Sequence, residues 1–317
     1  MKVLITGGAG GLGFNICKAF LEDGFDVRVF DLDNRVNQRR VRTLGASTDI
    51  MWGDITQLES VRRALDGVDA VVHLAAIIQP LTEKNPELAA RVNVGGTKTI
   101  VDLVKEKREP IPFVFTSSAS VFGLMPDATE PLHPDRNHPN PCNTYARTKV
   151  QAEEIIKGSG IPYVILRLTS TPHVSINFRL TDMRYNIFSI PLKNRFEFCH
   201  PDDVALAILN AVKNFDKVKD NTLIISGGPS QQMLYEDMLG AMLRNFGLPL
   251  PPQHKFATEP YPLHWYDTTR SQELLQFQHS TLADYTRDLS KQLPAPLTTF
   301  MRYFVGPVFG RAIVRLL

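Results

Sequence analysis

The stretch from residue 5 to residue 13, "ITGGAGGLG", decides the fold of this 317-residue chain. It follows an apolar run and precedes a helical pattern, and Gly7, Gly10 and Gly13 are spaced as GxxGxxG. Glycines in this context permit a tight turn and close backbone approach, which leaves N–H groups at a helix N-terminus free to hold a pyrophosphate. The stretch therefore predicts a dinucleotide site at the turn between the first strand and the first helix.

Short apolar, β-branched runs recur along the chain, with helical patterns between most of them. The runs are "KVLITG", "DVRVFDL", "TDIMWGD", "DAVVHLAA", "PFVFTSS", "YVILRL" and "TLIISGG". Near-continuous apolar strands are typical of a parallel sheet with both faces covered. We therefore predict an α/β fold with a doubly wound parallel Rossmann-type sheet. A long helix is expected from Pro86 to about Lys107, with the proline at its start.

The strand and helix rhythm weakens after Leu168, returns at residues 201–228 and then gives way to Pro-rich connections. We expect a dinucleotide-binding core from residues 1–168, to which residues 201–228 return. Residues 169–200 and 229–317 are expected to form a small, mostly C-terminal substrate-binding lobe and a tail.

The bulk composition is that of an ordinary globular protein. Hydrophobic content is 43%, charged content is 21% and the formal net charge is +2, which favours no nucleic-acid partner. The chain opens without the pattern of a secretory signal, so export is not expected. The three cysteines form no CxxC pair, which favours a reducing, cytoplasmic location. They are Cys17, Cys142 and Cys199.

A proline-rich segment gathers four side chains that can bind metals: His133, Asp135, His138 and Cys142. Their spacing matches no closed zinc pattern, so we predict a loop at the pocket mouth and no metal. His73 lies in an apolar run and is expected to be a hydrogen-bonded core histidine. His200, beside Asp202 and Asp203, is expected at a helix start.

The predicted second strand ends in Asp31, 18 residues after Gly13. A carboxylate there accepts hydrogen bonds from an adenosine ribose and repels a 2′-phosphate, which favours NAD over NADP. Three nearby arginines weaken this inference, and a helix-cap or turn role for Asp31 is the alternative. They are Arg35, Arg39 and Arg40. Asp54, which ends the third run, faces the adenine or caps the next helix.

Tyr145 is followed by Lys149, four positions along a predicted helix. This spacing puts both side chains on one face, where an ammonium stabilises an ionised phenol. The phenol is a poor base at neutral pH without such help. The alternative is a core tyrosine beside a solvated lysine. Ser117 and Ser118 end the strand "PFVFTSS", where a hydroxyl binds a substrate oxygen or satisfies local backbone groups.

Taken together, these motifs resemble the extended short-chain dehydrogenase/reductases, the NAD-dependent epimerase/dehydratase family. The likeness runs in the family's order over about two thirds of the chain. It is carried by "TGGAGGLG", "GDIT", "HLAA", "NVGGT", "TSSASVFG", "YARTK" and "FCHPDDVA".

The resemblance implies roles for individual residues. Ser118 polarises the reacting oxygen, Tyr145 is the acid/base, and Lys149 holds the nicotinamide ribose and lowers the pKa of the tyrosine. The implied cofactor is NAD. Its expected contacts are Gly7, Gly10, Gly11, Leu12, Gly13, Asp31, Asp54, Ile55, Leu74, Ala75, Ala76, Asn93, Tyr145 and Lys149.

The chain departs from the sugar-nucleotide members of that family. It has Ala119 and Ser120 where the 4,6-dehydratases have an Asp-Glu pair, and the segment after Leu168 has no Tyr-Gly-Pro turn. A smaller or more apolar substrate is suggested. Candidate substrate contacts are Ser118, Ser120, Arg195 and Arg270, of which the arginines are able to pair a diphosphate or to lie in solvent.

Three functions follow as hypotheses. The first is an NAD-dependent oxidoreductase that transfers hydride between nicotinamide and a secondary alcohol or ketone. The second is a nucleotide-sugar 4-epimerase with tightly bound NAD, and the third is an NAD-sensing binding protein. The resemblance also implies a homodimer through residues 86–107 and 145–157.

The C-terminal segment, residues 300–317, is apolar and basic. Its longest uncharged run is too short for a transmembrane helix. We expect this tail to pack on the body or a second subunit, or to contact a membrane surface.

Overall fold

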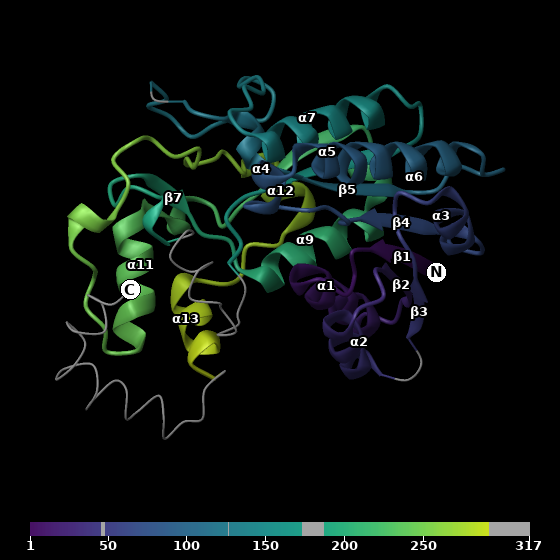
Figure 1. Cartoon of the computed structure of the whole chain (residues 1–317), viewed down its shortest axis with the longest axis horizontal. Coiled ribbons are helices and arrows are strands. Elements are labelled where there is room, and N and C mark those ends of the chain that lie inside the picture. Colours follow the sequence, from purple (N-terminus) through teal and green to yellow (C-terminus); the bar gives the residue numbers. More distant parts are fainter. Residues whose placement is uncertain (46–47, 126, 173–186, 292–317) are drawn as a thin grey trace.

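A computed structural model of the chain describes residues 1–45, 48–125, 127–172 and 187–291. At its centre lies a parallel sheet of seven strands in the order β3-β2-β1-β4-β5-β6-β8 (Figure 1). All seven predicted apolar runs supply these strands. They are β1 (Lys2–Thr6), β2 (Asp26–Asp31), β3 (Asp49–Trp52), β4 (Ala70–His73), β5 (Phe113–Ser118), β6 (Tyr163–Leu168) and β8 (Asn221–Ile225).

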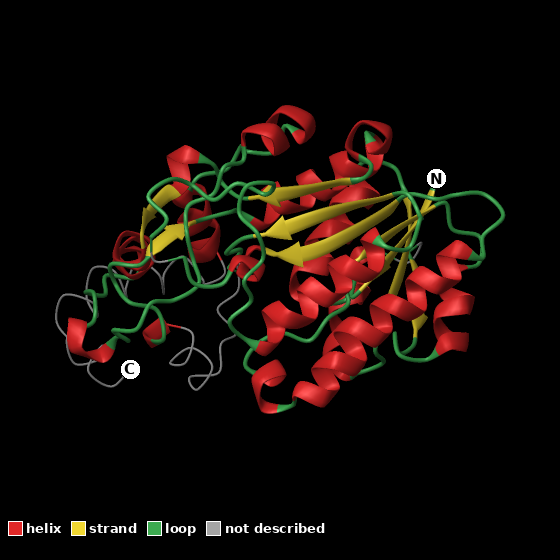
Figure 2. Cartoon of the chain, turned by 90° about the horizontal axis from the view of Figure 1, so that it is seen from above, coloured by secondary structure: helices red, strands yellow, loops and turns green. Residues whose placement is uncertain are grey.

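Helices cover both faces of the sheet, as Figure 2 shows from above. The strands are apolar on both sides for that reason: in β1, Val3 and Ile5 pack into one core and Leu4 into the other. The first core also contains side chains of α1 (Gly11–Glu22) and α9 (Pro201–Lys213). The second contains those of α3 (Leu58–Leu65), α6 (Gly96–Lys105) and α7 (Thr144–Lys157). The fold is therefore the predicted doubly wound α/β type.

The strand order reverses between β1 and β4, because the chain builds outward from β1 to β3 and then crosses to the other side. Such a switch point opens a crevice at the carboxyl ends of the strands, where ligands of open α/β sheets bind. The glycine loop at residues 7–13 lies at this position, directly after β1.

The predicted long helix is helical from Pro86 to Lys105, and Asn85 caps its start by accepting from the Leu88 N–H. It is not a uniform α-helix: α5 (Pro86–Ala89) passes into a π-helical segment, η2 (Ala90–Gly95), before α6 begins. Short π segments often occur at functional sites. This one carries Asn93.

A second, two-stranded antiparallel sheet pairs β7 (Arg195–Glu197) with β9 (Gln232–Leu234). It shares an apolar core with α11 (Tyr235–Asn245) and α13 (Leu282–Lys291). These elements lie beyond the carboxyl ends of the large sheet, toward which the strand arrows point in Figure 2. The other α-helices of the described residues are α2 (Arg35–Val41), α4 (Leu81–Lys84), α10 (Phe215–Val218) and α12 (Thr269–Leu275).

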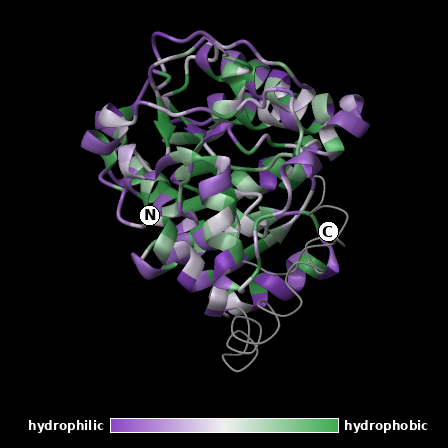
Figure 3. Ribbon diagram, turned by 90° about the vertical axis from the view of Figure 1, so that its left-hand side faces the viewer, coloured by the Kyte–Doolittle hydropathy of each residue, from purple (hydrophilic) through white to green (hydrophobic). Residues whose placement is uncertain are grey.

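The outward faces of the helices are largely hydrophilic and the sheet is hydrophobic (Figure 3). Within the described ranges, no helix combines the length and the apolarity needed to cross a membrane. The tail from Phe300 to Leu317, with the membrane, body or subunit contact expected of it, lies outside the described residues.

Candidate active site

A cleft of about 870 Å³ lies at the switch point and joins the glycine loop to the residues expected to carry chemistry. Ser118, Tyr145 and Lys149 line it together. Eleven of the expected cofactor contacts line the same cleft. They are Gly7, Gly10, Gly11, Leu12, Gly13, Asp31, Asp54, Ile55, Leu74, Ala75 and Ala76.

The glycine loop leaves a space next to its backbone that a side chain on Gly7 or Gly13 would fill. Gly7 has a φ of +73°, and a Cβ built on it would stand 2.9 Å from the Ala75 nitrogen. A Cβ on Gly13 would clash with the carbonyl oxygen of Gly7. The N-terminus of α1 has no side-chain cap, so its N–H groups face the cleft as an anion site. These features fit the pyrophosphate of a dinucleotide.

Asp31 ends β2 and holds the loop beside it. Its carboxylate accepts from the backbone N–H groups of Ala9 at 3.0 Å and Leu32 at 2.8 Å. Burial raises the pKa of Asp31, and these hydrogen bonds oppose the rise. Arg40 lies close, donating to the Ala9 carbonyl at 2.6 Å. The Asp31 carboxylate and the Arg40 guanidinium, which both bond to Ala9, therefore lie close together at the position where the sequence predicts the adenosine ribose.

Replacing Asp31 with alanine is expected to shift cofactor preference toward NADP by about tenfold or more. The reason is that a carboxylate which repels a 2′-phosphate is removed while Arg40 remains. Affinities for NAD and NADP measured by calorimetry check this. Asp33→Ala, an exposed carboxylate in the same loop, is the matched control. An unchanged affinity ratio in Asp31→Ala would contradict the role of Asp31.

Asp54 is not the N-cap of the following helix, which was the alternative role that the sequence left open. It lines the cleft, and its carboxylate accepts from the backbone N–H and the hydroxyl of Thr56, both at 2.8 Å. It thus fixes the turn that enters α3, although the residue at the N-cap position is Gln57.

Tyr145 and Lys149 stand on the inner face of α7, whose start is capped by Asn143 accepting from the Ala146 N–H at 2.8 Å. The Lys149 ammonium lies 5.9 Å from the centre of the Tyr145 ring and donates to the Thr116 carbonyl at 2.8 Å. Ser118, at the end of β5, lies beside Tyr145 and acts to lower its pKa. Strand and helix thus bring serine, tyrosine and lysine together.

Burial has the largest effect on the pKa values of Tyr145 and Lys149. It raises the pKa of Tyr145 to about 12, against the opposing hydrogen bond from Ser118. It lowers the pKa of Lys149 to about 8, while the negative charge of Glu153 acts in the opposite direction. The resemblance implied a lowered tyrosine pKa. In the protein alone it is raised, because desolvation of the phenolate outweighs the hydrogen bond with Ser118.

The two strand-end serines have different partners. The Ser117 hydroxyl donates to Glu153 at 2.6 Å, whereas Ser118 faces Tyr145. Ser120, a predicted substrate contact, does not line the cleft and donates to the Ser118 oxygen at 2.9 Å. This geometry favours Ser118 as the residue that binds a reacting oxygen.

Asn93 does not line the cleft, contrary to the expectation of a direct cofactor contact. Its side chain is buried, and its amide oxygen accepts from the Ile77 N–H while the nitrogen donates to the Ile77 carbonyl and to Thr148. It therefore holds the cleft wall at Ile77 against α7.

The two arginines expected near a diphosphate have other partners. Arg195 donates to the carbonyls of Ala128 and Thr129 and lies 4.6 Å from the Trp265 ring. Arg270 donates to Asn221, which begins β8 at the amino edge of the sheet, opposite the cleft. Neither arginine lines the cleft.

The other histidines singled out by the sequence have structural roles. His73 is buried between Thr6 and Thr97 at 2.7 and 3.0 Å, and burial lowers its pKa to about 3, so it is a neutral core histidine as predicted. His200 caps α9 by accepting from the Asp202 N–H. In the part of the chain that the structure describes, no three His, Cys, Asp or Glu side chains group closely enough to hold a metal.

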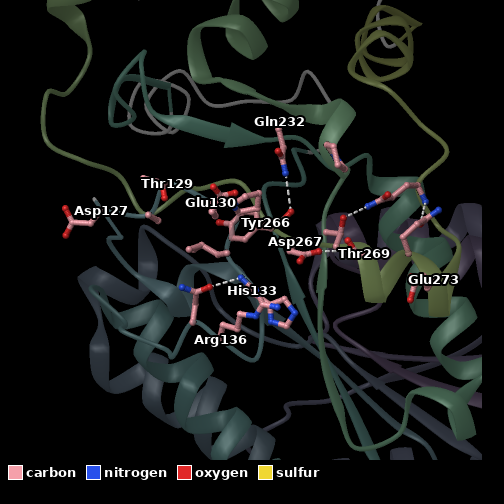
Figure 4. A pocket seen from close by; sticks show the side chains of 18 residues that line it. Asp127, Thr129, Glu130, His133, Arg136, Gln232, Tyr266, Asp267, Thr269 and Glu273 are labelled. Carbon is pink, nitrogen blue, oxygen red and sulfur yellow. Dashed lines mark hydrogen bonds between the residues drawn. The ribbon is translucent and has the colours of Figure 1, made fainter.

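A second cavity, of about 830 Å³, lies between the loop at residues 127–137 and residues 266–278 (Figure 4). Polar and charged side chains line it, among them Asp127, Glu130, Arg136, Asp267 and Glu273. None of the predicted catalytic or cofactor residues lines it. The three predicted catalytic residues line the first cleft instead.

The sequence did not single out the apolar wall beside Tyr145. Ile77, Ile78 and Leu81 line the cleft, and Ile78 and Leu81 are 61% and 44% exposed. Their position directly after the strand "DAVVHLAA" could have predicted a contact with ligands, because loops at the carboxyl edge of such a sheet contact ligands.

Curated relatives include a rat 3 beta-hydroxysteroid dehydrogenase type 7, 29% identical over 164 residues, which are 48% of this chain and 47% of the relative. A Mycobacterium tuberculosis 3 beta-hydroxysteroid dehydrogenase/Delta 5-->4-isomerase is 33% identical over 164 residues, 49% of this chain and 42% of the relative. An uncharacterised protein of Sinorhizobium fredii is 33% identical over 67% of this chain and 54% of its own length. The chain thus spans about half the length of the curated relatives it matches.

Among solved structures, the UDP-glucuronic acid 4-epimerase of Bacillus cereus, in complex with UDP-glucuronic acid and NAD, gives a TM-score of 0.76 at 22% identity, with 92% of this chain and 98% of that chain covered. The UDP-glucose 4-epimerase of Stenotrophomonas maltophila, with bound NAD, gives 0.76 at 21% identity, with both chains fully covered. At these identities the likeness establishes the fold.

The model of the NAD dependent epimerase/dehydratase family matches residues 3–226. This range contains the glycine loop, Asp31, Ser118, Tyr145 and Lys149. The chain belongs to the NAD dependent epimerase/dehydratase family.

Proposed function

We propose that this chain is an NAD-dependent oxidoreductase that acts on an apolar secondary alcohol or ketone. The observation that carries the proposal is the convergence of the glycine loop with Ser118, Tyr145 and Lys149 in one cleft. Bound NAD supplies the hydride acceptor or donor and, when oxidised, a further positive charge in the cleft. The glycine loop and Asp31 would hold it.

The chain's own side chains handle the proton. Ser118 donates a hydrogen bond to the oxygen of the substrate, and Tyr145 takes the proton from the alcohol or gives it to the ketone. Lys149 stabilises the phenolate that remains, because its ammonium and the phenol share one face of α7. A phenol with a pKa of about 12 depends on this charge at neutral pH.

The apolar wall supports an apolar substrate. Ile78 and Leu81 are large exposed hydrophobic side chains at the rim of a cleft that holds Tyr145, and such positions commonly bury apolar ligand surface. Among the described residues that line the cleft, Lys149 is the only Lys or Arg, so the described walls offer no second cation for a diphosphate. The relatives described above include 3 beta-hydroxysteroid dehydrogenases, which suits this substrate class.

Changing Ile78 and Leu81 to serine together is expected to raise KM for an apolar alcohol about tenfold to a hundredfold, with kcat little changed. Each side chain loses apolar contact that is made equally in the ground and transition states. Steady-state kinetics with a hydroxysteroid and with a short secondary alcohol measure the effect, which should be smaller for the short one. Leu58→Ser, exposed but outside the cleft, is the control. Equal KM values in both variants would exclude the apolar wall as a substrate contact.

Two alternative functions use the same NAD site. A nucleotide-sugar 4-epimerase would use the same catalytic residues, whereas an NAD-sensing binding protein would catalyse no reaction. Identification of the nucleotide released on denaturing freshly purified protein separates the epimerase from the dehydrogenase. A dehydrogenase must exchange its cofactor and is expected to bind NAD reversibly, whereas NAD retained through dialysis would indicate an epimerase that recycles it. A protein that binds NAD but turns over no alcohol, ketone or sugar nucleotide would indicate the sensor.

We further propose that the chain forms a homodimer through residues 86–107 and 145–157, acts in the cytoplasm and binds a small molecule through the lobe around β7 and β9. Support for a reducing compartment comes from the cysteines, all three of which are free thiols. Light scattering on the purified protein tests the dimer: a monomer mass would overturn it.

A further inference from the structure

A buried ion pair lies two helical turns behind Tyr145. Glu153 follows Lys149 by four residues on α7, as Lys149 follows Tyr145, so the three side chains share one face. Glu153 is 2% exposed. Arg167, on β6, donates to both of its oxygens, at 3.0 and 2.8 Å.

The carboxylate of Glu153 joins three elements. Ser117 on β5 donates to it at 2.6 Å, and Ser117 and Arg167 are direct partners in the register of β5 and β6. Arg167 is itself buried, and its guanidinium lies 4.9 Å from the Phe122 ring. The pair therefore fixes α7 against the strand that ends in Ser118.

We propose that Glu153 is a positioning residue of this active site: its buried carboxylate sets α7 against β5 and supplies the negative charge that holds the Lys149 side chain in its ammonium form. The inference rests on the proposed function, because the charge of Lys149 matters there only through Tyr145. It is a separate claim, since it concerns a residue that does not line the cleft.

The surroundings of Lys149 support an electrostatic role. The side chain is buried, 4.8 Å from the Phe115 ring, and burial lowers its pKa to about 8. Glu153 opposes that shift. The other titratable groups facing Lys149 are His73, which is neutral, and Tyr145, which is protonated near neutral pH.

The carboxylate itself stays charged. Burial raises the pKa of Glu153, but hydrogen bonds and charge from Arg167, with Ser117 and Lys157, more than offset it and leave the pKa lowered. Glu153 is thus a permanent negative charge at neutral pH. Removing it lowers the pKa of Lys149 further, and Lys149 then loses its proton as the pH rises through that lower value.

The test is a pH titration of Lys149 by NMR on lysine-labelled protein, with the resonance assigned by its loss in Lys149→Met. The wild type is expected to titrate near pH 8, with about half of Lys149 protonated there. In Glu153→Gln the midpoint should move to lower pH, so that most of Lys149 is neutral at pH 8. Glu154→Gln, an exposed neighbour on the same helix, should leave the midpoint unchanged.

Two variants keep the test decisive if Glu153→Gln folds poorly. Glu153→Gln with Arg167→Met removes the carboxylate without leaving the arginine unpaired and should also lower the midpoint, by less than Glu153→Gln because a positive charge is removed as well. Glu153→Asp keeps the charge and should stay near the wild type. A midpoint that is unmoved in the double variant, or moved equally by Glu153→Asp, would overturn the proposal. The titration of Lys149 needs no substrate, so its result can be interpreted even if no turnover is found.

Discussion

Phenylalanine at Tyr145 is expected to lower kcat by a factor of about 10² to 10⁴ or to abolish measurable turnover, while NAD affinity stays nearly unchanged. The phenol oxygen is the only part removed, and it is the atom that moves the proton beside Ser118. The glycine loop and Asp31, which would hold the cofactor, are untouched. Kinetics together with an NAD titration measure the two effects separately.

A tyrosine outside the cleft provides the control for this result. Tyr163 begins β6 at the amino edge of the sheet and does not line the cleft, so Tyr163→Phe should retain activity. If Tyr145→Phe turned over at the wild-type rate, the acid/base role of Tyr145 would be wrong even if the protein bound NAD.

Alanine at Gly13 is expected to weaken NAD binding by about a hundredfold or more. The added Cβ would meet the Gly7 carbonyl and the Gly8 backbone, neither of which can rotate away as a side chain does. Relief of the clash moves the loop or the first turn of α1, whose N–H groups form the anion site. Calorimetric titration with NAD measures the loss.

Gly95 is the matched control for Gly13. It lies in the helical stretch before α6 with an ordinary φ of −62°, and a Cβ there would stand 3.8 Å from the Ala90 carbonyl oxygen, an ordinary van der Waals contact. Gly95→Ala should therefore leave NAD affinity unchanged. Thermal denaturation of both variants distinguishes a local change in the glycine loop from unfolding of the protein. If a folded Gly13→Ala protein bound NAD with unaltered affinity, the loop would not hold the pyrophosphate.

Much of the fold was predictable because its determinants are local. Each strand of the large sheet is a short apolar run that needs no distant information to recognise, and the glycine spacing marks the turn after β1. The spacing of Tyr145 and Lys149 likewise fixes a shared helix face without knowledge of the tertiary structure. Strand ends at the carboxyl edge then place Ser118 near them.

The remaining features depend on tertiary contacts. Arg270 could have faced the cleft, but the helix that carries it packs beside the start of β8, which puts the guanidinium at the opposite edge of the sheet. Asn93 lies in a π-helical segment whose turn aims its amide at Ile77 and Thr148. The raised pKa of Tyr145 follows from burial, which no spacing in the sequence reports.

The central claim is that Tyr145 serves hydride transfer between NAD and an apolar secondary alcohol. Its most direct test incubates wild type and Tyr145→Phe with NAD and a panel of carbinol-deuterated alcohols, hydroxysteroids among them, together with a UDP-sugar. Deuterium-labelled reduced cofactor is expected with an apolar alcohol in the wild type, and almost none in Tyr145→Phe. Epimerisation of the UDP-sugar without net cofactor reduction, or equal labelling by both proteins, would contradict it.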